Sequence, residues 1–213
     1  MHQTPARDYK MAFGIGLAAS ALWFFVLRHL SLARGETFAA LVAIPLLSVL
    51  GVALAHRWFH GHVFHKFAKF LIVGVLNTGV DFFVFDTLIV LTGSATGAPI
   101  VAFKSFSFLC ALFGSYELNR LWTFDGEAAY SRTRREFMRF TLVTLVGFLV
   151  NVGTTTLIVS AMRPPLGLTQ IRWDNVAAVA ATALNLIWNF AGYKLFVFKS
   201  KGQPLDLTSS HAL

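Results

Sequence analysis

The sequence predicts an all-α integral membrane protein with six transmembrane helices, the last four of which form two two-helix repeats in parallel orientation. Three observations predict this class. Of the 213 residues, 56% are apolar and only 13% are charged, whereas soluble domains are about 25% charged. Six long apolar runs follow one another along the chain, and the second part of the chain contains the same pattern twice.

The six apolar runs have the length and character of membrane helices. They span roughly residues 11–27, 37–55, 67–91, 98–118, 137–161 and 174–198. A helix rises about 1.5 Å per residue, so about 20 residues cross the hydrocarbon layer. The last four runs reach that length, and the first two are shorter. Because the runs are continuously apolar and do not alternate with polar residues, helices are favoured over barrel strands.

The first two runs each carry a feature that bears on this assignment. The first ends with the aromatic residues 23–25 and Arg28, which suits an uncleaved anchor. The small-x-small pattern at 31–33 leaves a signal peptide as the alternative. In the second run Pro45 should produce a kink, which membrane helices tolerate.

The distribution of Lys and Arg predicts the orientation. With the N-terminus placed in the cytoplasm, 13 of the 18 basic residues lie on that side, four lie outside, and Lys104 falls within a run. The positive-inside rule therefore predicts that both termini are cytoplasmic. The net charge of +8 is explained in this way without a nucleic-acid partner.

An internal duplication covers the last four runs. Lys69-Phe70 opens one run and Arg139-Phe140 opens another, an offset of 70 residues. The runs that follow close on the aromatic segments 116–124 and 190–198, an offset of 74, which fits a four-residue insertion in the second outer loop. Two helices return the chain to its starting side, so both halves should share one orientation. Trp122 and Phe196, in the closing segments, are predicted to be interfacial anchors.

These motifs resemble the GtrA-like family of small membrane proteins over residues 67–198. The matching segments are 69–78 with Asp81, Ala102-x-Lys104, 119–124, Arg139-Phe140, Asn151 and 189–198. The resemblance implies a bacterial inner-membrane protein that flips a polyprenyl-phosphate-linked sugar for cell-surface polysaccharide, or assists the glycosyltransferase. The chain is expected to have three parts: two N-terminal helices that are extra to the family pattern, with a His-rich cytoplasmic loop, in 1–66; a repeat domain in 67–201; and a short polar, disordered tail in 202–213.

Charged residues inside the runs are the main candidates for a site, because a charge at the bilayer centre costs about 2.5–3.5 kcal/mol on insertion scales. The third run holds Asp81 and Asp86, and the fourth holds Lys104. Lys104 should lie about 9 Å below the outer end of its helix, within reach of either acid. One interpretation is a structural ion pair. The other is that Lys104 is a cation for the lipid phosphate and that Asp81 balances its charge.

Other polar residues extend the candidate site. Arg120 and Asn119 would form a cytoplasmic loading site with help from Lys69, although the positive-inside rule alone would also explain Arg120. Amides beside Trp188 are candidates for sugar recognition, with hydrogen bonding between helices as the alternative. The complete candidate site for lipid phosphate and sugar is Lys104, Arg120, Asn119, Asp81, Asn77, Glu117, Lys69, Asn151, Asn185 and Asn189.

Several motifs are expected to have no chemical role. Imidazoles bind metals, but His56, His60, His62 and His65 should lie in a wet cytoplasmic loop. Cys110, the only cysteine, excludes an internal disulfide and a multi-cysteine metal site. The pattern Gly14-x-Gly16 imitates a dinucleotide fingerprint without a strand before it, so it indicates helix packing.

The leading hypothesis is therefore a translocator of polyprenyl-phosphate sugar that is not an enzyme and needs no metal or cofactor. The expected partners are the lipid substrate, the bilayer, a second copy of the chain and a membrane glycosyltransferase. One alternative is an accessory subunit without transport activity that recruits the glycosyltransferase through the basic loop 125–139. Another is a small exporter of cationic drugs, in which Asp81 would be essential.

Overall fold

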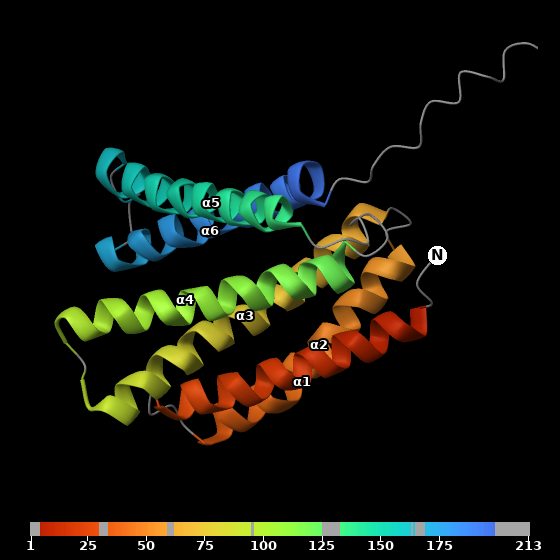
Figure 1. Cartoon of the computed structure of the whole chain (residues 1–213), viewed down its shortest axis with the longest axis horizontal. Helices are drawn as coiled ribbons and strands as arrows, with labels where there is room; N and C mark the ends of the chain where they lie inside the picture. The colour runs from red at the N-terminus through yellow and green to blue at the C-terminus, as the bar shows by residue number, and fades with distance from the viewer. Residues whose placement is uncertain are drawn as a thin grey trace, which may run out of the picture. The chain divides into compact units, whose positions relative to one another are not determined.

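The computed structural model describes residues 5–29, 34–58, 62–94, 96–124, 133–162, 164 and 169–198. All regular structure in this part of the chain is helical, and six helices are long and apolar enough to cross a membrane. The helices are α1 (Pro5–His29), α2 (Arg34–Trp58), α3 (His62–Thr92), α4 (Ala98–Leu118), α5 (Arg134–Ala161) and α6 (Gln170–Gly192) (Figure 1). The predicted class, an all-α protein with six membrane-spanning helices, is confirmed.

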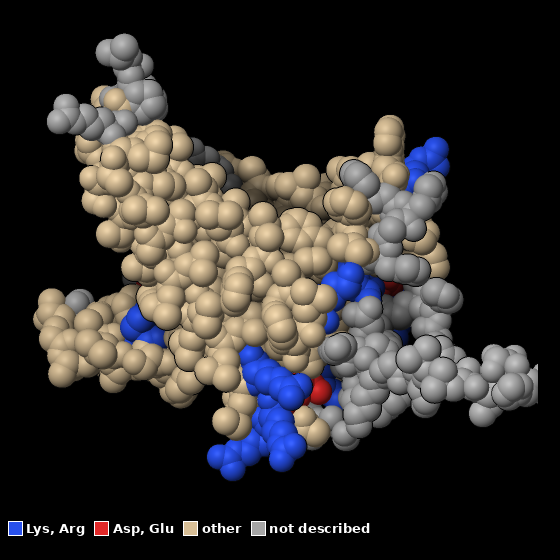
Figure 2. Space-filling view, turned by 90° about the horizontal axis from the view of Figure 1, so that it is seen from above, with Lys and Arg blue, Asp and Glu red and all other residues tan. Residues whose placement is uncertain are grey.

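The surface also has the character of a membrane protein. Large apolar side chains are exposed on every helix, among them Leu46 and Leu47 on α2 and Leu109 on α4. Most of the face seen in Figure 2 is uncharged, and Lys and Arg gather in a few places. A soluble monomer rarely exposes apolar surface so widely, so these side chains face lipid or protein partners.

The first three helices are longer than the apolar runs predicted. The helix α1 begins at Pro5 where the run begins at 11, and α3 begins at His62 where the run begins at 67. Hydropathy marks only the part of a helix that suits hydrocarbon, whereas the helix continues into the polar zone. Asp8 in the first turn of α1 favours this extension, because a carboxylate stabilises a helix N-terminus.

The chain divides into two compact units, Met1–Asp125 and Gly126–Leu213. In the first unit, α1 packs against α2 at Gly16, where an added Cβ would lie 2.7 Å from the Pro45 Cα and 2.9 Å from the Ser48 Oγ. Gly16 therefore has the predicted packing role, whereas nothing lies within 4 Å of an added Cβ at Gly14. Pro45 lies inside α2, which continues on both sides of it.

The helix α1 also packs against α3. The Trp23 indole donates a hydrogen bond to the Val75 carbonyl (3.1 Å), and an added Cβ on Gly79 would lie 3.3 Å from the Trp23 Nε1. Nearer the N-terminus of α1, a core forms from Ala12, Ile15, Val52, Ile72, Val73 and Trp122. The prediction that Trp122 is an interfacial anchor is wrong, because this side chain is 1% exposed inside that core.

The second unit is a two-helix hairpin. The Trp188 indole of α6 donates to the Val143 carbonyl of α5 (3.0 Å), and the Thr144 hydroxyl bonds to the Tyr193 hydroxyl (2.7 Å). The Phe140 and Tyr193 rings stack with their centroids 4.3 Å apart. At the start of α5, the Thr133 hydroxyl caps the helix by accepting from the Glu136 amide (3.1 Å).

The two closing segments end their helices in the same way. A π-helical turn follows α4 at η1 (Asn119–Thr123), and another follows α6 at η2 (Tyr193–Val197). The Phe124 amide donates to the Asn119 carbonyl, and the Phe198 amide donates to the Tyr193 carbonyl, both at 2.8 Å. These rare turns stand 74 residues apart, which is the offset of the sequence duplication. The symmetry that relates the two halves stays a prediction.

Candidate functional site

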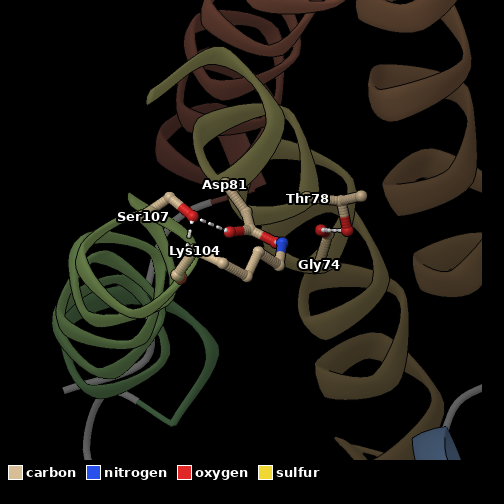
Figure 3. A network of polar contacts seen from close by, with 5 residues as sticks. All are labelled: Gly74, Thr78, Asp81, Lys104 and Ser107. Atoms are coloured by element: carbon tan, nitrogen blue, oxygen red, sulfur yellow. Dashed lines mark hydrogen bonds and ion pairs between the residues drawn. The ribbon is translucent and has the colours of Figure 1, made fainter. Parts of the chain in front are cut away.

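An ion pair between α3 and α4 lies at the centre of the candidate site (Figure 3). The Lys104 Nζ is 2.5 Å from the Asp81 Oδ2, and the Ser107 hydroxyl donates to the Asp81 Oδ1 at 2.6 Å. The predicted reach of Lys104 is therefore used for Asp81 and not for Asp86. Asp81 thus accepts a charge-assisted hydrogen bond on each of its two oxygens.

The start of α4 determines the depth of this pair. The helix begins at Ala98, directly after Gly97, which has a φ of +74°, a value that favours glycine. Pro99 occupies the first turn, where its missing N–H costs nothing. Lys104 lies six residues after Ala98, about 9 Å into the helix. Ser107 follows three residues later, so both side chains lie on the face of α4 toward Asp81.

Lys104 has free capacity to bind an anion. Its side chain is 50% exposed, compared with 21% for Asp81. An ammonium carries three donors, and among the described residues Asp81 is its only hydrogen-bond acceptor. The Phe82 and Phe85 ring centroids lie 5.7 Å and 5.4 Å from the Lys104 Nζ, close enough for cation–π attraction. These contacts hold the cation in place and leave donors available.

A second charged network, which the sequence analysis missed, joins α1 to α3 and η1. The buried Asp8 carboxylate contacts the Lys69 Nζ (2.6 Å) and the His65 Nε2 (2.8 Å). The Trp122 indole donates to the same carboxylate (3.1 Å), and the Lys69 Nζ lies 5.6 Å from the Trp122 ring centroid. This network attaches α1 to the repeat domain.

The network changes the interpretation of two residues. Lys69, expected to assist a loading site, is buried and paired with Asp8, so it can meet a phosphate only if Asp8 moves. His65, expected in a wet loop, is partly buried against the same carboxylate. His60 and the side chain of His62 lie outside the described residues. Asp8, a lone acid just before the first apolar run, is the sequence signal that could have indicated this network.

The predicted loading residues lie near the opposite end of α4. Arg120 is sixteen residues after Lys104, about 24 Å along the helix axis, and is half-buried together with Glu117. Asn119 is fully buried, and its amide donates to the Ser115 carbonyl (2.9 Å) and hydroxyl (3.2 Å). Arg120 therefore lies far from Lys104, and the Asn119 amide is used in hydrogen bonds near the end of its own helix.

The predicted sugar-binding amides of the second unit contact one another. Asn189 donates to the Asn185 Oδ1 at 2.9 Å, and the oxygens of both amides lie where a Cβ on Gly147 would clash. The Asn151 amide reaches the Thr182 hydroxyl across the α5–α6 contact at 3.4 Å. These contacts favour the alternative role of the amides in helix association.

In the first unit the asparagine lies on the first helix of the pair and the glycine on the second. Asn77 on α3 is buried, donates to the Val73 carbonyl (2.8 Å), and points its oxygen at Gly114 on α4, where an added Cβ would lie 3.0 Å away. Gly147 corresponds to Asn77 in the duplication. The amide therefore comes from the first helix in one half and from the second helix in the other.

Comparison with known proteins identifies a family for this chain. Residues 69–198 match the family model described as the GtrA/DPMS transmembrane domain. The matched stretch covers more than half of the chain and begins at Lys69, so it includes Asp81 and Lys104 but not Asp8 or His65. No curated protein and no solved structure matches the chain.

Proposed function

Because this chain belongs to the GtrA/DPMS transmembrane domain family, a multi-pass membrane family with a role in glycan synthesis from polyprenyl-phosphate sugars, we propose that it translocates a polyprenyl-phosphate-linked monosaccharide. The lipid-linked sugar would cross the bacterial inner membrane, and both termini of the protein would lie in the cytoplasm. In this proposal the chain is a transporter and not an enzyme, and it needs no metal or cofactor.

The half-exposed Lys104 at membrane depth is the observation that carries the proposal. A charged side chain facing hydrocarbon is costly, so this face of α3 and α4 should line a polar path or a protein contact. A lipid phosphate cannot cross hydrocarbon without a partner, and a lysine ammonium supplies charge-assisted hydrogen bonds. Lys104 meets both requirements within the matched family domain.

The contacts of Asp81 allow an exchange of anions at Lys104. When a phosphate oxygen takes the place of the Asp81 Oδ2, the released carboxylate keeps its hydrogen bond from Ser107 on the other oxygen. The exchange therefore breaks one contact and leaves the second in place. Arg120, half-buried near the far end of α4, would make the first phosphate contact on the cytoplasmic side. The cation beside Asp81 disfavours the drug exporter, because it would repel a cationic substrate.

The test measures flipping of a polyprenyl-phosphate monosaccharide by purified protein in liposomes. The sugar is radiolabelled, and a membrane-impermeant oxidant reports the fraction of this lipid that lies in the outer leaflet. Lys104→Ala should reduce the rate roughly ten- to a hundredfold, because a hydrogen bond to a charged group contributes about 1.5–3 kcal/mol. Lys10→Ala, which removes an exposed cation from α1, is the matched control and should flip normally. Normal flipping by folded Lys104→Ala protein would refute the proposed role.

An accessory subunit that recruits a membrane glycosyltransferase is the second candidate. Arg134 and Arg135 are exposed in the first turn of α5, where the helix dipole disfavours cations, so a contact with an acidic partner would stabilise them. Arg132, part of the same predicted patch, lies outside the described residues. Co-purification of the transferase that is lost on Arg134→Ala with Arg135→Ala, but unaffected by Lys104→Ala, would support this candidate.

A further inference from the structure

Positions that correspond in the two halves differ sharply in how they are covered. Ile72 on α3 is 8% exposed, whereas Leu142, 70 residues later on α5, is 59% exposed. Trp122 is 1% exposed, whereas Phe196, 74 residues later, is 60% exposed. The local contacts are otherwise alike, because η1 packs on α3 as η2 packs on α5.

In the first half the cover is α1. This helix places Asp8, Ala12, Ile15 and Ala19 in its buried stripe, a spacing that repeats every three to four residues and so follows one helix face. Asp8 pairs with Lys69, the apolar positions pack on Ile72 and Trp122, and Gly79 meets Trp23. The cover is thus an apolar stripe with a carboxylate near its N-terminal, predicted cytoplasmic, end.

The second half presents the matching surface without such a helix among the described residues of its own unit. Arg139, Leu142, Leu149 and Phe196 correspond to Lys69, Ile72, Gly79 and Trp122, and all four are exposed. We call these four residues the open face. On α5, Arg139, Leu142 and Leu149 are separated by three and seven residues, so they share one side of the helix.

We propose that the open face binds a transmembrane helix of a partner protein that carries an Asp or Glu near its cytoplasmic end. The acid would pair with Arg139 as Asp8 pairs with Lys69, and the apolar residues that follow it would cover Leu142 and Leu149. The inference does not depend on lipid translocation by the chain.

Charge argues against a second copy of this chain as the occupant. A two-fold dimer in the membrane brings the same surfaces together, so two open faces would place Arg139 near Arg139. The chain's own acidic helix, α1, already pairs with Lys69. A different protein that supplies the acid satisfies the arginine without this conflict.

The test uses the whole 213-residue chain in a bacterial membrane, with the photo-cross-linking residue p-benzoylphenylalanine at Leu142. Phe148 is the matched control position, because it is exposed and its counterpart in the first half, Thr78, is also exposed. Cross-linking at Leu142 should exceed that at Phe148 at least tenfold, and sequencing should place an Asp or Glu in the partner helix near its cytoplasmic end. Arg139→Glu should reduce the adduct at least tenfold, and changing the partner's acid to Lys should restore it.

The other outcomes would overturn the inference. Adducts with lipid alone at Leu142 would show that the open face is covered by the bilayer. Adducts within one chain, or with another copy of it, would show that the chain itself covers the open face. A partner adduct that Arg139→Glu leaves unchanged would remove the charge argument. Arg139→Gln, which removes the charge without reversing it, should give a smaller loss, and an unchanged gel-filtration profile would show that both variants fold.

Discussion

The two halves of this membrane protein share a sequence pattern but differ in charge inside the membrane. The first half holds Asp81 and Lys104 between its helices, whereas the corresponding residues of the second half are Asn151 and Ala178. At the predicted cytoplasmic end the first half buries Lys69 against Asp8, whereas the second half exposes Arg139. The Lys69 example indicates that a duplicated helix pair can bury a charge where an added helix, here α1, supplies the partner.

The same comparison shows that packing space is used in equivalent ways. Each half places an asparagine opposite a glycine, Asn77 against Gly114 and Asn185 with Asn189 against Gly147, but the two halves take the amide from different helices. A small residue on either helix lets an amide approach its neighbour closely. Which helix carries the amide is therefore less constrained than the need for a glycine opposite it.

Removing the Asp8 carboxylate, which pairs with Lys69, should have the largest effect on stability. Asp8→Ala removes the carboxylate that pairs with the buried Lys69, and breaking a buried pair in this way costs about 3–5 kcal/mol. The expected result is a clear fall in Tm of the purified protein in detergent. Arg139→Ala is the matched control, because it removes an exposed cation at the corresponding position of the second half and should leave Tm nearly unchanged.

A double variant separates charge from packing in the same experiment. Asp8→Asn combined with Lys69→Met removes both charges together, and replacing a buried ion pair with uncharged residues is often close to neutral. The double variant should therefore recover most of the Tm lost by Asp8→Ala. Equal Tm values for Asp8→Ala and Arg139→Ala would contradict the claim that α1 is attached by this network.

Filling the glycine gaps should have an intermediate effect that differs between the halves. A Cβ at Gly147 clashes with two amide oxygens, whereas a Cβ at Gly114 is 3.0 Å from one. Overpacking costs typically about 1–3 kcal/mol, so Gly147→Ala should lower Tm more than Gly114→Ala. Gly74→Ala, where nothing lies within 4 Å of an added Cβ, should leave Tm unchanged or raise it. A reversed order would show that the amides rotate away freely.

The sequence predicted what depends on residues near one another in the chain. Helix length and apolar character indicated six spans, and depth along the helix brought Lys104 within reach of Asp81. The choice between Asp81 and Asp86 needed the rotation of α3, because residues five apart differ by about 140° around a helix. The burial of Trp122 and its contact with Asp8, 114 residues away, depend on how α1 packs, which hydropathy at single positions does not describe.

The smallest expected effect concerns a hydrogen bond found between α5 and η2. The Thr144 hydroxyl bonds to the Tyr193 hydroxyl and to the Phe140 carbonyl of its own helix, whereas the Thr141 hydroxyl bonds to the Phe137 carbonyl. Thr144→Val removes the hydrogen bond to the buried Tyr193 hydroxyl, and a typical hydrogen bond within a protein contributes about 0.5–1.5 kcal/mol to stability. Thr141→Val keeps a similar shape and removes only a bond within the helix, so it should lower Tm less. An equal loss of Tm in Thr144→Val and Thr141→Val would mean that Tyr193 stabilises η2 through ring stacking on Phe140 and not through its hydroxyl.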